Sequence, residues 1–210
     1  MSAHNPNARL EAFSDGVFAI AATLLIIEIK VPTLDTLNEH NTLWQALAHH
    51  WASWMAYILS FGTMFIGWIN THALFKYLNK TSNQFIYANG LLLMCIASFP
   101  FPTALMAEYI GTEYEQTGII VYGIFSLFCN VAWVVLFHSA IKPKNLAKNE
   151  ASFAKLIQGR KLCMQGFVLF LFILVMAFWF PRIALCLMIL SWFVWLILGI
   201  VFGNKAEVED

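Results

Sequence analysis

Two polar residues stand together at the start of the first apolar stretch, and their side chains could take part in ion or proton chemistry. Ser14 and Asp15 directly precede the apolar run that begins at Gly16. An ionisable group at the edge of a membrane span is costly unless it is paired or faces water, which makes Asp15 a candidate functional residue. Two structural interpretations compete: the carboxylate lies at headgroup level, or it only anchors a hydrogen bond.

More polar side chains occur at the ends of two later apolar stretches. The second stretch carries Trp68, Asn70 and His72 near its end, and the third has Asn89 near its beginning. If these stretches cross a membrane in succession, all four side chains lie at the depth of the polar pair described above. An indole N–H, an amide, an imidazole, a hydroxyl and a carboxylate can then satisfy one another.

The first stretch also carries a narrow stripe of side chains at helical spacing. A stripe of this kind faces either a partner helix or the axis of a pore, and spacing alone favours helix packing without distinguishing the two. Thr23 is its only hydroxyl. Its members are Gly16, Ile20, Thr23, Ile27 and Lys30, with Leu24 just beside them.

The sequence argues against enzymes and metal sites. It contains four cysteines but no C-x-x-C pair, and neither H-E-x-x-H nor G-x-S-x-G occurs in it. Twelve basic and twelve acidic residues cancel, so charge indicates no nucleic-acid partner. We therefore expect no catalytic residues, no metal and no cofactor.

Composition identifies the environment of the chain. Of its 210 residues, 60% are hydrophobic and 11% are charged, against about 25% charged in soluble domains. About 20 apolar residues in a helix cross a bilayer. Six stretches qualify, and together they predict an all-α membrane protein with a single six-helix domain over residues 1–210. They are residues 10–29, 51–74, 85–106, 118–141, 162–180 and 183–202.

The distribution of charge predicts the orientation. Ten of the twelve basic residues fall on one side of the six predicted spans, and only Lys30 and Arg182 fall on the other. By the positive-inside rule, both termini are then cytoplasmic. The outer side is acidic, which would concentrate cations there; ordinary loop solvation explains it equally well. The acidic residues are Asp35, Glu39, Glu108, Glu113 and Glu115.

Local signals predict where helices begin and end. Asn5-Pro6 resembles an N-cap followed by proline at the first helical position. Phe99-Pro100-Phe101-Pro102 is expected to kink or end the third span. Pro143 marks the end of the fourth, and residues 142–161 are interpreted as a polar helical connection.

At this point the sequence resembles a known family. Arg9-x-x-x-Phe13-Ser14-Asp15 at the head of the first of six spans is similar to the signature of the transmembrane protein 175 family. That family comprises endosomal and lysosomal potassium channels and their prokaryotic relatives. The resemblance continues from Gly16 to Ala21, through Lys30-Val31-Pro32, through Trp68-x-x-x-His72, and from Asn89 to Pro102. The last three spans are generic.

The resemblance implies a potassium-permeable cation channel of the single-repeat prokaryotic branch. Such a channel is a homotetramer in the plasma membrane, with potassium as the permeant ion and four first helices lining the pore. By position, Ile20, Leu24 and Ile27 are the hydrophobic constriction, and Thr23 places a hydroxyl near its narrowest layer. The motif residues Phe13, Ser14 and Asp15 would tie the pore helix to Trp68, His72 and Asn89.

Two features agree with a hydrophobic constriction, and one alternative stays open. The sequence has no T-V-G-Y-G-like string, and the outer segment 107–117 is too short for a re-entrant filter, so we expect no carbonyl filter. The alternative is a proton-coupled secondary transporter that uses Asp15 and His72 as a relay. The lack of an internal repeat and of a charge at mid-membrane counts against it.

Overall fold

The computed structural model describes residues 6–33 and 42–207, which are mostly helical. The helices are α1 (Ala8–Leu24), α3 (Leu43–His49), α4 (Trp51–Lys76), α5 (Asn83–Ser98), α6 (Pro100–Tyr109), α7 (Glu115–Ile141), α8 (Glu150–Ala177) and α9 (Pro181–Glu207), with 3₁₀ turns η1 (Leu25–Glu28) and η2 (Lys144–Leu146). Within the described ranges, six segments are long and apolar enough to cross a bilayer, which confirms the all-α membrane fold. These segments are Ala8–Glu28, Trp51–Lys76, Asn83–Tyr109, Glu115–Ile141, Glu150–Ala177 and Pro181–Leu198.

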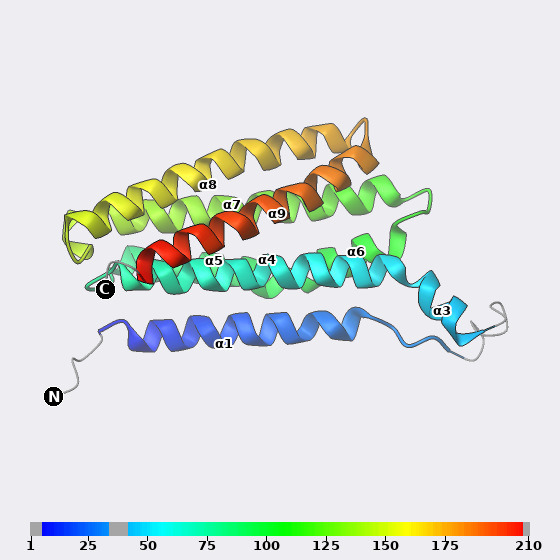
Figure 1. Ribbon diagram of the computed structural model, residues 1–210, viewed down its shortest axis with the longest axis horizontal. Helices are drawn as coiled ribbons and strands as arrows, with labels where there is room; N and C mark the ends of the chain where they lie inside the picture. The colour runs from blue at the N-terminus through cyan, green and yellow to red at the C-terminus, as the bar shows by residue number, and fades with distance from the viewer. Residues whose placement is uncertain (1–5, 34–41, 208–210) are drawn as a thin grey trace.

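The long helices run side by side along the long axis of the molecule (Figure 1). In this view α1 lies at one edge and α8 at the other, with α4, α5 and α7 between them. The start of α1 and the end of α9 lie at the same end of the bundle. That end, termed the basic end, carries Arg9, Lys76, Lys80, Lys142, Lys148, Lys155, Arg160 and Lys161. The opposite end, termed the acidic end, carries Glu108, Glu113 and Glu115; Asp35 and Glu39 lie outside the described residues.

One face of α1 packs on α4 and α5. Ser14, Phe18, Ala21 and Leu25 recur at four- and three-residue intervals, and all four are buried. Phe18 lies so close to α4 that a Cβ atom built on Gly67 would come within 3.2 Å of the Phe18 ring. The glycine therefore lets α1 approach α4 closely.

The bounds of α1 differ from the expectation at both ends. The helix begins at Ala8, with Asn7 in the N-cap position, and Asn5 lies outside the described residues. The buried Asn7 amide instead donates a hydrogen bond to the carbonyl of Leu78 at 3.3 Å. At the other end, the predicted α-helix over 10–29 changes at Leu25 into a 3₁₀ turn. Tight turns of this kind are common at helix ends, and the β-branched residues that follow favour helix weakly.

The third span is broken as its prolines predict. Helix α5 ends at Ser98 and α6 begins with Pro100 at its first position. Proline has no N–H to continue the hydrogen-bond ladder, and its fixed φ suits the first turn of a new helix. The break places Phe99 in the core, where its ring makes an edge contact with Tyr122 at a centroid distance of 5.7 Å.

The connection between the fourth and fifth spans is partly helical, as expected, and its helical part is continuous with the fifth span. Helix α7 ends at Ile141, before Pro143, as predicted. Helix α8, however, already begins at Glu150, well before residue 162, because the Asn149 side chain caps it by accepting a hydrogen bond from the Ser152 N–H at 2.7 Å. Its 28 residues give a length of about 42 Å, longer than the apolar core of a bilayer.

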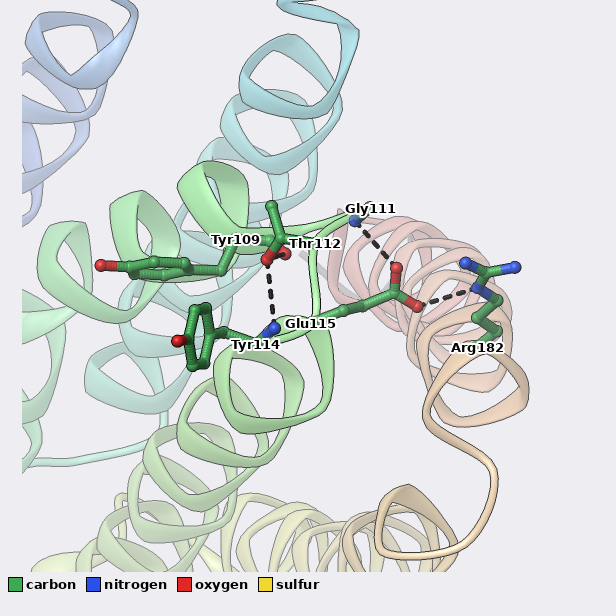
Figure 2. A network of polar contacts seen from close by, with 6 residues as sticks. All are labelled: Tyr109, Gly111, Thr112, Tyr114, Glu115 and Arg182. Carbon is green, nitrogen blue, oxygen red and sulfur yellow. Dashed lines mark hydrogen bonds and ion pairs between the residues drawn. The ribbon is translucent and has the colours of Figure 1, made fainter.

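At the acidic end, an ion pair and local hydrogen bonds join the ends of the helices (Figure 2). Glu115 accepts a hydrogen bond from the Gly111 N–H at 2.8 Å and pairs with Arg182 Nε at 2.9 Å, which joins α7 to the start of α9. Gly111 has φ +80°, a conformation that favours glycine. Lys30 pairs with Glu108 at 3.1 Å, so both basic residues predicted on this side, Lys30 and Arg182, pair with carboxylates of the acidic end.

Candidate pore helix and its polar network

Ser14 and Asn89 form the buried part of the polar network. The Asn89 amide donates to Ser14 Oγ at 2.9 Å, and the Ser14 hydroxyl donates to the Leu10 carbonyl at 2.8 Å. Ser14 is 1% exposed and Asn89 is fully buried. The Ser14 hydroxyl therefore accepts one hydrogen bond and donates another while it links α1 to α5.

Asp15 and Trp68 form the second link, this time between α1 and α4. The Trp68 indole N–H donates to Asp15 Oδ1 at 2.8 Å. The Trp68 ring also stacks with His72 one turn further along α4, with centroids 6.1 Å apart and an interplanar angle of 23°. Trp68 thus lies between Asp15 and His72 and contacts both.

Three polar or aromatic residues lie outside this network. Arg9 and Phe13 are exposed, and Arg9 makes no ion pair within residues 6–33 and 42–207. Asn70, which we expected among the network partners, instead lines a cavity between α4 and α7, α8 and α9. It lies two residues from both Trp68 and His72, which places its side chain on a different face of α4.

The opposite face of α1 exposes the predicted stripe. Ile20 is 62% exposed, Leu24 is 43% and Ile27 is 71%, and Thr23 is exposed beside them. The Thr23 hydroxyl donates to the Ile20 carbonyl at 2.8 Å, so its oxygen lone pairs stay available on the exposed surface. This face of α1 is apolar, and the described residues of the chain leave it exposed. The buried contacts on the opposite side of α1 hold the helix against α4 and α5.

The 3₁₀ turn affects how Ile27 is placed. In an α-helix Ile27 lies slightly off the line of Leu24, but a 3₁₀ turn has three residues per turn and brings residues i and i+3 into line. Ile27 therefore extends the row of Leu24, and it is more exposed than Ile26, which is 45% exposed.

A buried hydroxyl cluster also supports the bundle, and the sequence analysis did not identify it. Ser60 Oγ lies 2.7 Å from Thr103 Oγ1 and 3.4 Å from the Tyr122 hydroxyl, joining α4, α6 and α7. The sequence does show an isolated hydroxyl in each of three apolar stretches. It does not show that these hydroxyls lie close together, because their proximity depends on how the helices pack. Within the described residues, no group of three or more His, Cys, Asp or Glu side chains is placed to hold a metal.

Comparison with known proteins agrees with this arrangement. Residues 9–100 match the family described as "Endosomal/lysosomal potassium channel TMEM175". The chain is 43% identical over 141 residues to a potassium channel of Chamaesiphon minutus, covering 67% of this chain and 69% of that one. It is 32% identical over 139 residues to the endosomal/lysosomal proton channel TMEM175 of Gallus gallus, covering 63% of this chain and 28% of the longer relative.

A solved structure extends the match to nearly the whole chain. The crystal structure of a lysosomal potassium-selective channel TMEM175 homolog from Chamaesiphon minutus superposes with a TM-score of 0.84 at 31% identity, over 93% of this chain and 99% of that chain. The fold and the site define a multi-pass helical membrane protein of the ion-channel class, not an enzyme. The chain belongs to the TMEM175 family.

Proposed function

We propose that the chain is one subunit of a homotetrameric, potassium-permeable cation channel whose pore is lined by the first helix of each subunit. One observation carries this proposal: α1 buries Ser14, Phe18, Ala21 and Leu25 against its own subunit and leaves the opposite face uncovered. Copies related by a rotation axis can bring that uncovered face to a common centre. The potassium-channel relatives support conduction of this ion.

Ile20, Leu24 and Ile27 would form the constriction. In a tetramer each position contributes four apolar side chains to one layer, and such layers control conduction by excluding water when they are narrow. An ion must then lose part of its hydration shell to pass. Because potassium releases water more easily than sodium, a modest preference for potassium follows without a carbonyl filter, and the Thr23 hydroxyl offers an oxygen to the partly dehydrated ion.

The polar network would position the pore helix rather than conduct ions. Ser14 and Asp15 are bonded to Asn89 on α5 and Trp68 on α4, so one end of α1 is tied to two neighbouring helices of its own subunit. In this proposal, Arg9 and Phe13 of the signature motif and His72 beside Trp68 complete the support at the basic end. By the positive-inside rule that end is cytoplasmic, and the protein resides in the plasma (inner) membrane of a prokaryotic cell.

A proton-coupled transporter is the second candidate, because Asp15 and His72 share a contact with Trp68. An indole is a donor only and cannot accept a proton from one neighbour and pass it to the other. The relay therefore lacks a direct path, which favours the channel. Saturable, proton-dependent uptake into liposomes that is abolished by Asp15→Asn would favour the transporter instead.

Cysteine accessibility tests which face of α1 lines the pore. A water-soluble thiol reagent added from the acidic end is expected to reduce the conductance of Ile27→Cys channels, because Ile27 is the constriction residue nearest that end. Ile183→Cys is the matched control: it lies near the same end on α9 and is 50% exposed. Treated wild type controls for the four native cysteines. Equal effects on both variants would contradict the pore assignment.

A further inference from the structure

A cavity separate from the proposed pore lies within each subunit, between α4, α7, α8 and α9. Its volume is ≈ 220 Å³. No described residue of α1 lines it, and in Figure 1 α1 and α8 lie at opposite edges of the bundle. Its lining on α4 runs from Leu59 to Tyr77, a distance of about 27 Å at the helical rise, so the cavity is elongated along the helices.

The cavity changes character along its length. Towards the middle of the bundle and the acidic end, its lining is largely apolar and includes Leu59, Phe170 and Met188. At the basic end it is lined by Asn70, Lys155 and Gln158. The site therefore combines a long apolar part with one cationic, hydrogen-bonding end, which is the complement of an anionic amphiphile.

Lys155 supplies the charge at this end, and no ion pair among the described residues neutralises it. The two ion pairs of the described residues are both at the acidic end and do not include Lys155. Lys155 lies little more than one turn from the start of α8, a helix longer than the apolar core of a bilayer, so its ammonium group reaches the headgroup level. Gln158 lies three residues further along, on the same side of the helix.

We propose that the cavity binds one acyl chain of an anionic phospholipid from the leaflet at the basic end, with the lipid phosphate on Lys155. The size suits part of one chain: a protein cavity of about 150 Å³ accommodates benzene, so ≈ 220 Å³ accommodates a segment of a single acyl chain and leaves no room for a second chain beside it. The second chain remains in the bilayer. Negative charge is also the property that distinguishes lipids of the cytoplasmic leaflet.

This site goes beyond the proposed channel function and does not depend on it. Lipid binding is measured on the purified full chain without conduction, so a silent channel leaves the binding test intact. Conversely, failure to bind the lipid leaves the pore assignment on α1 untouched.

Native mass spectrometry of the purified protein with added phosphatidylglycerol or phosphatidylcholine tests the proposal. The wild type is expected to retain phosphatidylglycerol about five-fold more strongly, the contribution of one lysine near an anionic headgroup. Lys155→Gln is expected to lose that preference. Lys161→Gln is the matched control, because Lys161 lies on the same helix, is exposed and does not line the cavity.

A variant that fills the cavity provides a second test of lipid binding. Ala73→Phe places a ring in the part of the cavity near the basic end and is expected to reduce retention of both lipids several-fold. Unchanged preference in Lys155→Gln, or wild-type retention in a folded Ala73→Phe protein, would overturn the proposal. Retention of oleate as strong as that of phosphatidylglycerol would also overturn it, in favour of a free fatty acid. If Ala73→Phe does not fold, the two lysine variants still decide the question.

Discussion

At the scale of single residues, the hydrogen bonds of Ser14 and Asp15 determine how α1 is held. Side-chain hydrogen bonds between membrane helices average about 0.6 kcal/mol, with a maximum of about 1.7 kcal/mol. Two such bonds do not hold a bundle together by themselves. In the proposed channel their directionality would fix the rotation of α1, and with it the face on which Ile20 and Thr23 lie.

The Ser14–Asn89 bond can be measured by a double-mutant cycle. Ser14→Ala, Asn89→Ala and the double variant are expected to show a coupling free energy of about 0.6–1.7 kcal/mol, because each single change removes the same bond and the second removes nothing further. The readout is the free energy of unfolding in detergent. Strictly additive effects would show that the 2.9 Å contact does not contribute to stability.

The Thr23 hydroxyl and the Ile20 side chain are expected to affect selectivity. Thr23→Ala removes an oxygen from the proposed constriction, so we expect a weaker preference for potassium over sodium. Ile20→Asn replaces an apolar side chain of the proposed constriction with one that binds water, so we expect higher sodium permeation. Thr63→Ala is the control, because its hydroxyl also donates at 2.8 Å to its own helix but lies on α4. Unchanged permeability ratios in both α1 variants would remove these residues from the pore.

At the scale of helices, α1 is placed by a close approach to α4 at Gly67. A Cβ atom there would lie 3.2 Å from the Phe18 ring, whereas a Cβ atom on Gly90 of α5 would meet nothing within 4 Å. Gly67→Val is therefore expected to destabilise the protein by about 1–3 kcal/mol through overpacking, and Gly90→Val to leave its stability nearly unchanged. Thermal unfolding of both variants measures this. Equal melting temperatures of the two variants would show that α1 can move away from α4 without loss of stability.

Much of this helix layout could be predicted from the sequence, because hydropathy and proline act locally. Six apolar runs gave six spans, and Pro100 and Pro143 mark a break and an end that the structure contains. The 3₁₀ turn at Leu25 was not predicted, nor was the joining of the helical part of the linker and the fifth span into one helix, α8, that begins at Glu150. Both depend on small differences in free energy at helix ends, where capping by Asn149 outweighs the polar composition of the linker.

The site could be predicted in part. Matching depths along successive spans brought Ser14, Asp15, Trp68 and Asn89 together, as the hydrogen bonds show. Asn70 was wrongly included, because depth does not specify which face of a helix a residue occupies. The cavity beside Lys155 could not be predicted at all, since it depends on how four helices pack.

At the scale of the whole molecule, the charge distribution and the uncovered face of α1 agree with the proposed assembly, whose symmetry axis would run parallel to the long helices. Basic residues gather at one end, and carboxylates at the acidic end pair with Lys30 and Arg182 through Lys30–Glu108 and Glu115–Arg182. Surface ion pairs of this kind contribute little to stability. The stability of the subunit therefore depends mainly on the apolar contacts between its helices.

The reversal potential in a planar bilayer is the most direct test of the central claim. Purified protein is placed between a potassium solution and a sodium solution of equal concentration. We predict that the reversal potential is shifted from zero towards the potassium equilibrium potential, as expected of a channel that prefers potassium. Reversal at zero, or a silent bilayer with proton-dependent saturable uptake into liposomes, would contradict it.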